Sequence, residues 1–240
     1  MSRSLRTGLR AAAATLLVSA FGAILWHGFS YGDAGAARID RWIDTARDLG
    51  TRNVVSAIYL GTRFFDSVLE LLVFAVAVLG VRHFLGQAKL HESVRPAAPV
   101  AESHVVSAAA RLMLPIIVLL GVYLAVHGHL SPGGGFSGGV VAASGLLLAA
   151  IAIGSAPVTE RLGRTGLERV EWGAMLLILG LVFAPVALAL PPFSPLLPGG
   201  TLGRLASGTN VLPYNLLIAS KVFVGSWTIV QHFLQHRGGI

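Results

Sequence analysis

The sequence predicts an all-α, polytopic membrane protein with about six transmembrane helices. Of its 240 residues, 54% are hydrophobic and only 12% are charged, whereas a typical soluble domain is about 25% charged. Apolar runs recur along the chain, each near the roughly 20 residues that a helix needs to cross the hydrocarbon core. Polar or Gly- and Pro-rich stretches separate them. So little polar side-chain material cannot cover a water-soluble globule of this size.

The composition also excludes several functional classes. The chain has no cysteine, which excludes disulfides, iron–sulfur ligation and thiolate zinc sites. The net charge of +7 comes from basic residues scattered around the apolar runs, so it does not indicate a nucleic-acid partner. No catalytic triad, phosphate-binding loop or hydrolytic carboxylate pair can be recognised. We therefore expect no enzyme, no cofactor and no metal site.

The apolar runs define the expected spans. The first, residues 9–29, follows Arg3, Arg6 and Arg10 and also resembles a signal peptide, but its length favours a retained helix. Residues 30–63 alternate in charge sign and predict a hydrated segment, with an amphipathic helix near 37–49 and a short interfacial helix near 53–63. The remaining spans are expected at about 64–85, 108–126, 136–155, 171–190 and 212–234.

The stretches between the spans suggest how the chain is divided. Residues 86–107 are polar, aperiodic and contain Pro96 and Pro99, which is typical of a linker. We predict a two-helix module at 1–85, this linker at 86–107, and a four-helix module at 108–240. Residues 156–170 are expected to be a short charged connection. Residues 191–211, rich in Pro and Gly, are expected to fold back on the membrane face.

The distribution of Lys and Arg predicts the orientation. With the N-terminus in the cytoplasm, eleven basic residues fall on the cytoplasmic side and six on the other, and Lys221 lies within a span. The positive-inside rule then favours both termini in the cytoplasm and the loop at 127–139 near the outer face.

That loop, HGHLSPGGGFSGG, separates two apolar runs and carries no Lys, Arg, Asp or Glu. Its glycines and Pro132 cannot continue a helix, because glycine costs about 1 kcal/mol and proline about 3 kcal/mol relative to alanine. Glycine permits positive φ and close backbone approach. The loop is therefore either a compact helix–helix turn or a site that presents backbone N–H groups.

The same residues carry a resemblance to a known family. HGHLSPGGGFSGGVVAA, with Arg111-Leu-Met-Leu-Pro115 before it, is similar to the signature of the B subunit (MnhB) of Mrp-type multisubunit Na+/H+ antiporters. A weaker match in the same order runs from Pro195 to Asn210, and together they cover roughly residues 105–235. The resemblance implies a structural signature loop formed by six consecutive residues: Ser131, Pro132, Gly133, Gly134, Gly135 and Phe136.

A second resemblance lies in the N-terminal half. The run from Asn53 to Glu70 is similar to a segment of the E subunit of membrane-bound hydrogenases and of the C-terminal end of the Mrp A subunit, although Phe64 and Ser67 depart from the pattern. Arg63, Asp66 and Glu70 share one helix face. They form either a capping and salt-bridge cluster or a carboxylate site on a polar path.

Lys221 and His127 are the other candidates for ion or proton transfer. Lys221 lies about 14 Å into its span at 1.5 Å per residue, and a charge at that depth is a functional candidate by default. We expect its partner to be a carboxylate of a neighbouring subunit or a water-filled path; a structural lysine that snorkels is the alternative. His127 either relays protons or pins the loop. His129 is expected to be structural, and Glu171 to open the fifth span.

The resemblances together predict an accessory membrane subunit of a multisubunit cation/proton antiporter, in a bacterial inner membrane. Its partners would be the other membrane subunits, including large antiporter-like ones, together with lipid and Na+ or H+. It would support assembly and line an ion path. Two alternatives stay open: a membrane-arm subunit of a redox-coupled complex such as a membrane-bound hydrogenase, and a small self-sufficient transporter.

Overall fold

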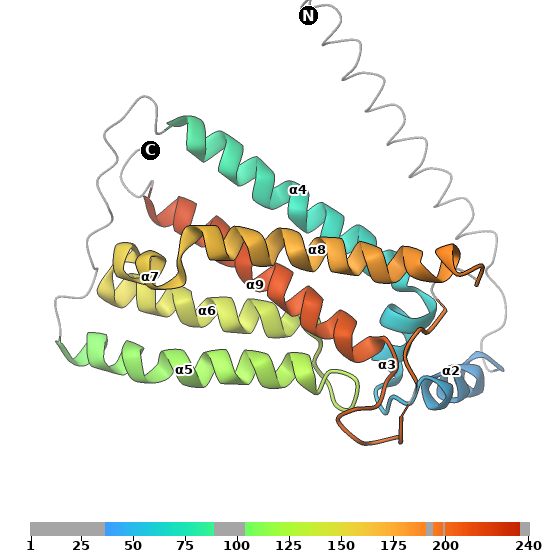
Figure 1. Ribbon diagram of the computed structural model, residues 1–240. Helices are drawn as coiled ribbons and strands as arrows, with labels where there is room; N and C mark the ends of the chain where they lie inside the picture. The colour runs from blue at the N-terminus through green and yellow to red at the C-terminus, as the bar shows by residue number, and fades with distance from the viewer. Residues whose placement is uncertain (1–36, 89–103, 191–193, 199, 236–240) are drawn as a thin grey trace, which may run out of the picture. The chain divides into compact units, whose positions relative to one another are not determined.

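The computed structural model describes residues 37–88, 104–190, 194–198 and 200–235 (Figure 1). In this part of the chain every regular element is helical, and the all-α expectation is confirmed. Five helices are long and apolar enough to cross a membrane: Phe64–Leu85, His104–Val126, Gly135–Ile153, Gly166–Ala187 and Val211–Leu234. The first span expected from the sequence, residues 9–29, lies outside the described residues.

The amphipathic helix expected near 37–49 is α2 (Ala37–Asp48), and the short interfacial one is α3 (Val54–Ala57) followed by a π-helical turn, η1 (Ile58–Thr62). The side chain of Asn53 caps α3 by accepting a hydrogen bond from the N–H of Ser56 at 3.2 Å. Such a cap satisfies one of the free N–H groups of the first turn. The cap uses Oδ1 of Asn53, which leaves its Nδ2 to donate hydrogen bonds to a second segment.

Two connections differ from expectation because helices extend further than the apolar runs. Helix α4 (Phe64–Ala88) and helix α5 (His104–Val126) both continue into the ends of the predicted linker. The connection at 156–170, expected to be short and charged, is itself helical. It contains α7 (Ser155–Leu162), and α8 (Arg164–Ala187) begins well before Glu171. Hydropathy cannot detect such ends, because charged residues continue a helix once it leaves the hydrocarbon.

The packing is organised by two helices, α6 (Gly135–Ile153) and α9 (Val211–Gln235). Helix α5 packs on α6, α6 packs on α9, and α8 and α4 also pack on α9 (Figure 1). Residues 42–240 form one compact unit, so α4, from the predicted N-terminal module, is packed against the C-terminal one. The division into modules at 1–85 and 108–240 stays a prediction.

Glycine allows α6 to approach two neighbours closely. A Cβ on Gly138 would lie 2.6 Å from the carbonyl oxygen of Gly121 in α5, and one on Gly139 would lie 2.6 Å from that of Ala219 in α9. Adjacent glycines therefore face different partners. Small residues at such crossings are typical of transmembrane helix packing, where close contact replaces the hydrophobic driving force.

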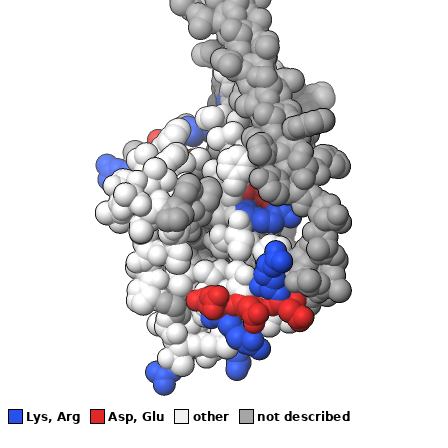
Figure 2. All heavy atoms as spheres, turned by 90° about the vertical axis from the view of Figure 1, so that its right-hand side faces the viewer, with Lys and Arg blue, Asp and Glu red and all other residues white. Residues whose placement is uncertain are grey.

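Large apolar side chains cover much of the remaining helix surface. Leu119 of α5 is 66% exposed and Leu176 of α8 is 67% exposed, as expected for helix faces turned toward lipid. Figure 2 shows one face on which Asp and Glu gather in a band with neighbouring Lys and Arg, while much of the described surface is uncharged. On this face the exposed charges are therefore concentrated in one band. Lys221 and Glu171 are charged residues that are instead buried, and they belong to the candidate site.

Candidate functional site

The glycine-rich loop connects α5 to α6 and ends at Gly134, the N-cap of α6. Gly133 and Gly134 have φ values of +152° and +151°, a region that side chains with a Cβ rarely adopt. A Cβ on Gly134 would also collide with the hydroxyl of Tyr59. Glycine is therefore required here for two reasons: the positive φ values of Gly133 and Gly134, and the close approach of Tyr59 in η1 to Gly134.

Two asparagines, far from the loop in sequence, hold it in place. Asn53 donates through Nδ2 to the carbonyl oxygens of Gly128 at 2.8 Å and Ser131 at 2.9 Å. Asn215 of α9 is fully buried and accepts a hydrogen bond from the N–H of Gly135 at 2.8 Å. The loop is thus anchored within the chain from both sides, and α6 starts against a fixed acceptor.

The two loop histidines have different environments. The side chain of His127 stacks on Tyr123, with ring centroids 4.2 Å apart, and its Nδ1 lies 3.2 Å from the Tyr123 carbonyl oxygen. His129 is fully buried, and its own carbonyl accepts hydrogen bonds from the N–H groups of Arg52 at 3.0 Å and Asn53 at 3.1 Å. Burial lowers the pKa of His129, an effect that nearby backbone groups partly offset. A neutral, buried His129 is what a packing role requires.

Beside the loop lies a cavity of about 430 Å³, bounded by η1, α4, the start of α6 and α9. Its lining combines one carboxylate, three hydroxyl groups, the glycine backbone and three apolar side chains: Tyr59, Ser67, Glu70, Leu71, Gly133, Gly134, Gly135, Phe136, Ser137 and Ile218. Burial raises the pKa of Tyr59, and the charge of Glu70 adds to this effect while Ser56 opposes it. The cavity brings Glu70 together with the signature loop at residues 131–136, which is distant in sequence.

The carboxylates predicted on one face of α4 separate in the structure. Asp66 pairs with Arg63 at 2.5 Å, and both side chains are largely exposed at the start of the helix. Glu70 lines the cavity and has no ion-pair partner among the residues that the structure describes. Asp66 therefore forms the salt bridge that one alternative expected, whereas Glu70 lines the cavity, and its place on a polar path stays a prediction.

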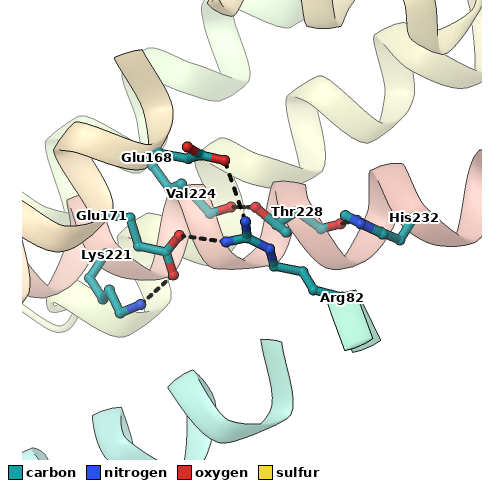
Figure 3. Close-up of polar contacts among 7 residues, drawn as sticks. All are labelled: Arg82, Glu168, Glu171, Lys221, Val224, Thr228 and His232. Atoms are coloured by element: carbon teal, nitrogen blue, oxygen red, sulfur yellow. Dashed lines mark hydrogen bonds and ion pairs between the residues drawn. The ribbon is translucent and has the colours of Figure 1, made fainter. Parts of the chain in front are cut away.

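Lys221 has a partner within the same chain (Figure 3). Its Nζ donates to Oε1 of Glu171 in α8 at 2.5 Å, and the two residues are only 4% and 6% exposed. Arg82 of α4 lies on the other side of Glu171, with 4.0 Å between Nη1 and Oε2, and its Nη2 is 3.4 Å from Oε1 of Glu168. These four residues form an electrically balanced group, hereafter the charge cluster.

The charge cluster corrects two expectations from the sequence. Glu171 does not open its helix, because α8 begins at Arg164 and places Glu171 about two turns inside. The partner of Lys221 needs no neighbouring subunit. A usable signal was present: Glu168 and Glu171 are spaced i, i+3, which puts two carboxylates on one helix face, and a buried lysine requires a counter-charge.

The charge cluster and the cavity share helix α9. Ile218 borders the cavity and Lys221 follows three residues later, about 4.5 Å along the helix axis. His127 and Asp66 do not line the cavity and do not belong to the charge cluster. Among the described residues, no group of three His, Cys, Asp or Glu side chains is placed to hold a metal ion.

Comparison with known proteins places the chain in a family. A family described as a domain related to the MnhB subunit of Na+/H+ antiporters matches residues 105–228. No curated protein matches the chain. Solved structures also contain similar chains, and two of these come from a respiratory membrane complex and an Mrp complex.

The first is a chain of the membrane-bound sulfane sulfur reductase, an archaeal respiratory membrane complex, with 26% identity and a TM-score of 0.71 over 94% of this chain and 98% of that one. The second is a chain of the Mrp complex from Dietzia sp. DQ12-45-1b, with 25% identity and a TM-score of 0.63 over 97% of this chain. Only 26% of that Mrp chain is covered. The predicted resemblance to MnhB is confirmed: the chain belongs to the family of domains related to the MnhB subunit of Na+/H+ antiporters.

Proposed function

We propose that this chain is an accessory membrane subunit of a multisubunit cation/proton-translocating complex of the Mrp type or a related respiratory type. The family match over residues 105–228 supports this role, as do two similar chains that both come from multisubunit membrane complexes. The partners are other membrane subunits, including large antiporter-like ones, and the surrounding lipid. The chain assists assembly and lines part of an ion path.

The observation that carries the ion-path proposal is the cavity between Glu70 and the glycine loop. A carboxylate in the first turns of a membrane helix, facing hydroxyl groups and glycine backbone, suits the transient binding of Na+ or a proton. Lys221, one turn of α9 beyond the cavity, is the second protonatable group of the path. Asp66 and His127 lie outside the cavity lining, and their proposed part is proton exchange at its approach.

A self-sufficient transporter is disfavoured by the sequence, which carries one deeply placed basic residue and no internal repeat of the kind common in autonomous transporters. A redox-coupled complex is the second candidate. The archaeal sulfane sulfur reductase chain supports it, since that relative is matched over 98% of its length. The soluble subunits that co-purify with this chain distinguish the two complexes.

The orientation is also proposed. With both termini in the cytoplasm of a bacterial cell, the charge cluster lies toward the cytoplasmic side and the glycine loop toward the outer face. The excess of Lys and Arg on the cytoplasmic side supports this arrangement. Labelling of single cysteines, introduced into this cysteine-free chain at positions 102 and 201, tests it.

The function is tested by purifying the complex through a tag on this chain and measuring proton and Na+ movement in vesicles. Glu70→Gln should abolish or sharply reduce transport while leaving the complex assembled, because the amide cannot exchange a proton. Glu160→Gln, on the exposed surface of α7, is the matched control. Unchanged transport with Glu70→Gln excludes Glu70 from the path, and failure of the chain to co-purify with any membrane subunit excludes the accessory role.

A further inference from the structure

The charge cluster joins a nearly solvent-free ion pair to the molecular surface through a graded series of side chains. Lys221 and Glu171 expose 5% and 8% of their side chains, Arg82 exposes 29%, and Glu168 exposes 42%. The four residues come from three helices, α4, α8 and α9. The series therefore runs from the interior of the helix packing to an exposed carboxylate.

Two cations compete for one buried carboxylate. Lys221 contacts Oε1 of Glu171 directly, whereas Arg82 is 4.0 Å from Oε2 and has its closer contact, 3.4 Å, with Glu168. Figure 3 shows the guanidinium lying between the two carboxylates, with Lys221 on the other side of Glu171. A guanidinium stays protonated under all physiological conditions, so only Lys221 and the two carboxylates can gain or lose protons.

We propose that Glu171 is the proton-exchange partner of Lys221, and that Arg82 controls this exchange by shifting between Glu171 and Glu168. This inference rests on the proposed function, in which Lys221 belongs to the ion path, and it assigns a role to three residues outside that path. It makes the charge cluster a proton outlet that leads from the interior to Glu168.

In the proposed step a proton passes from Nζ of Lys221 to Oε1 of Glu171. One N–H bond breaks and one O–H bond forms, and both groups become neutral without any oxidant or reductant. The exchange is feasible because desolvation penalises both charges, which brings the neutral pair close in free energy to the ion pair. When the proton leaves Glu171 for Glu168 or water, Arg82 supplies the counter-charge that the neutral lysine no longer provides.

Few other titratable groups lie on the helices around the pair. Two histidines are the nearest in sequence: His83 follows Arg82 in α4, and His232 of α9 has its Nδ1 2.8 Å from the carbonyl oxygen of Thr228 (Figure 3). Helix α6, which packs along α9, carries no titratable residue. Helix α7 carries Glu160 and Arg161, both exposed. Glu70 of α4 faces the cavity on the Ile218 side; it is the group from which Lys221 would be recharged. Within the described chain, Arg82 and Glu168 are thus the charged groups placed against the Lys221–Glu171 pair.

The test is infrared difference spectroscopy of the intact complex in lipid during a pH jump, combined with vesicle transport. The wild-type complex should show the carbonyl band of a protonated carboxyl group that shifts in D₂O. Glu171→Gln should remove this band and lower transport by about 100-fold, the contribution of a positioned acid–base group. Glu168→Gln should keep the band, which identifies Glu171 as its source.

Arg82 provides a readout that a purely structural role would not change. Loss of a positive charge about 4 Å away should raise the pH of half-maximal carboxyl protonation by about 1 unit or more in Arg82→Gln. Arg82→Lys keeps the positive charge, so it should keep the wild-type pH of half-maximal carboxyl protonation. Arg169→Gln, an exposed neighbour on α8, is the control and should leave the midpoint unchanged. If Glu171→Gln does not assemble, the Arg82 variants still test whether Arg82 controls the protonation of the buried carboxyl group.

Two results overturn the inference. One is a wild-type complex that transports protons without any carboxyl band that depends on Arg82. The other is full transport by an assembled Glu171→Gln complex. Both leave the proposed function intact, whereas a wild-type complex that moves no ions refutes the proposed function and leaves the infrared result to be judged separately.

Discussion

Removal of either partner of the buried Lys221–Glu171 pair should destabilise the protein, whereas removal of both should nearly restore it. Breaking a buried ion pair leaves one uncompensated charge and costs about 3–5 kcal/mol. Replacing both partners with apolar side chains of similar size is often neutral. The structure refines these values, because Arg82 is a second cation beside Glu171 and offers no counter-charge to Lys221.

In Lys221→Met, the carboxylate of Glu171 still faces Arg82 at 4.0 Å. At that distance and an effective dielectric constant of 20, the attraction is about 4 kcal/mol, so we expect a loss of only about 1–3 kcal/mol after compensation. In Glu171→Leu, Lys221 loses its described partner, and the carboxylate that it shares with Arg82 is gone. That loss should reach the full value of about 3–5 kcal/mol. The double variant should lie within about 1 kcal/mol of wild type.

The measurement is equilibrium unfolding of the purified chain in mixed micelles, followed by circular dichroism and tryptophan fluorescence. The coupling energy of the double-mutant cycle should exceed about 2 kcal/mol. Arg169→Met, at an exposed position, is the control and should change stability by less than about 0.5 kcal/mol. Additive losses, or a larger loss in Lys221→Met than in Glu171→Leu, would refute the assigned pairing.

Three further predictions concern the loop and the chain as a whole. Gly134→Val should destabilise the start of α6 by at least about 2 kcal/mol through the forced φ and the collision with Tyr59, so native gels should show loss of the assembled complex. Gly80→Val, where a Cβ meets no neighbour within 4 Å, should assemble normally. Because burial lowers the pKa of His129, the stability that it contributes is complete above its unfolded value of about 6.5 and is lost as the pH falls toward the lowered value; thermal melts between about pH 7.5 and about pH 5 should show a smaller decrease in His129→Gln. Expressed alone, the chain should insert into membranes without exchanging Na+ for H+ in vesicles, and robust exchange would contradict the accessory role.

The sequence by itself determined the class of protein, the order of its elements and its family. These properties depend on local features: apolar runs as long as the hydrocarbon is thick, glycine and proline that interrupt them, and a loop motif at 131–136 that is specific enough to identify MnhB relatives. The same dependence on local features explains why the predicted positions of the helix ends were less accurate. Charged residues such as Glu168 were assigned to the connection before the fifth span, although α8 includes them.

Only the tertiary structure decided which side chains meet. Glu171 and Lys221 are 50 residues apart, and Gly135 and Asn215 are 80 apart; no local pattern links them. A soluble helix reveals its buried face through an apolar stripe, whereas a membrane helix is apolar on the lipid-facing side as well. The spacing of Glu168 and Glu171 could place both carboxylates on one face of α8, but it could not show that this face packs against Lys221 of α9. The close approach at Gly138 and Gly139 fixes how α6 packs on α5 and α9, and the packing of α8 on α9 brings the two charges together.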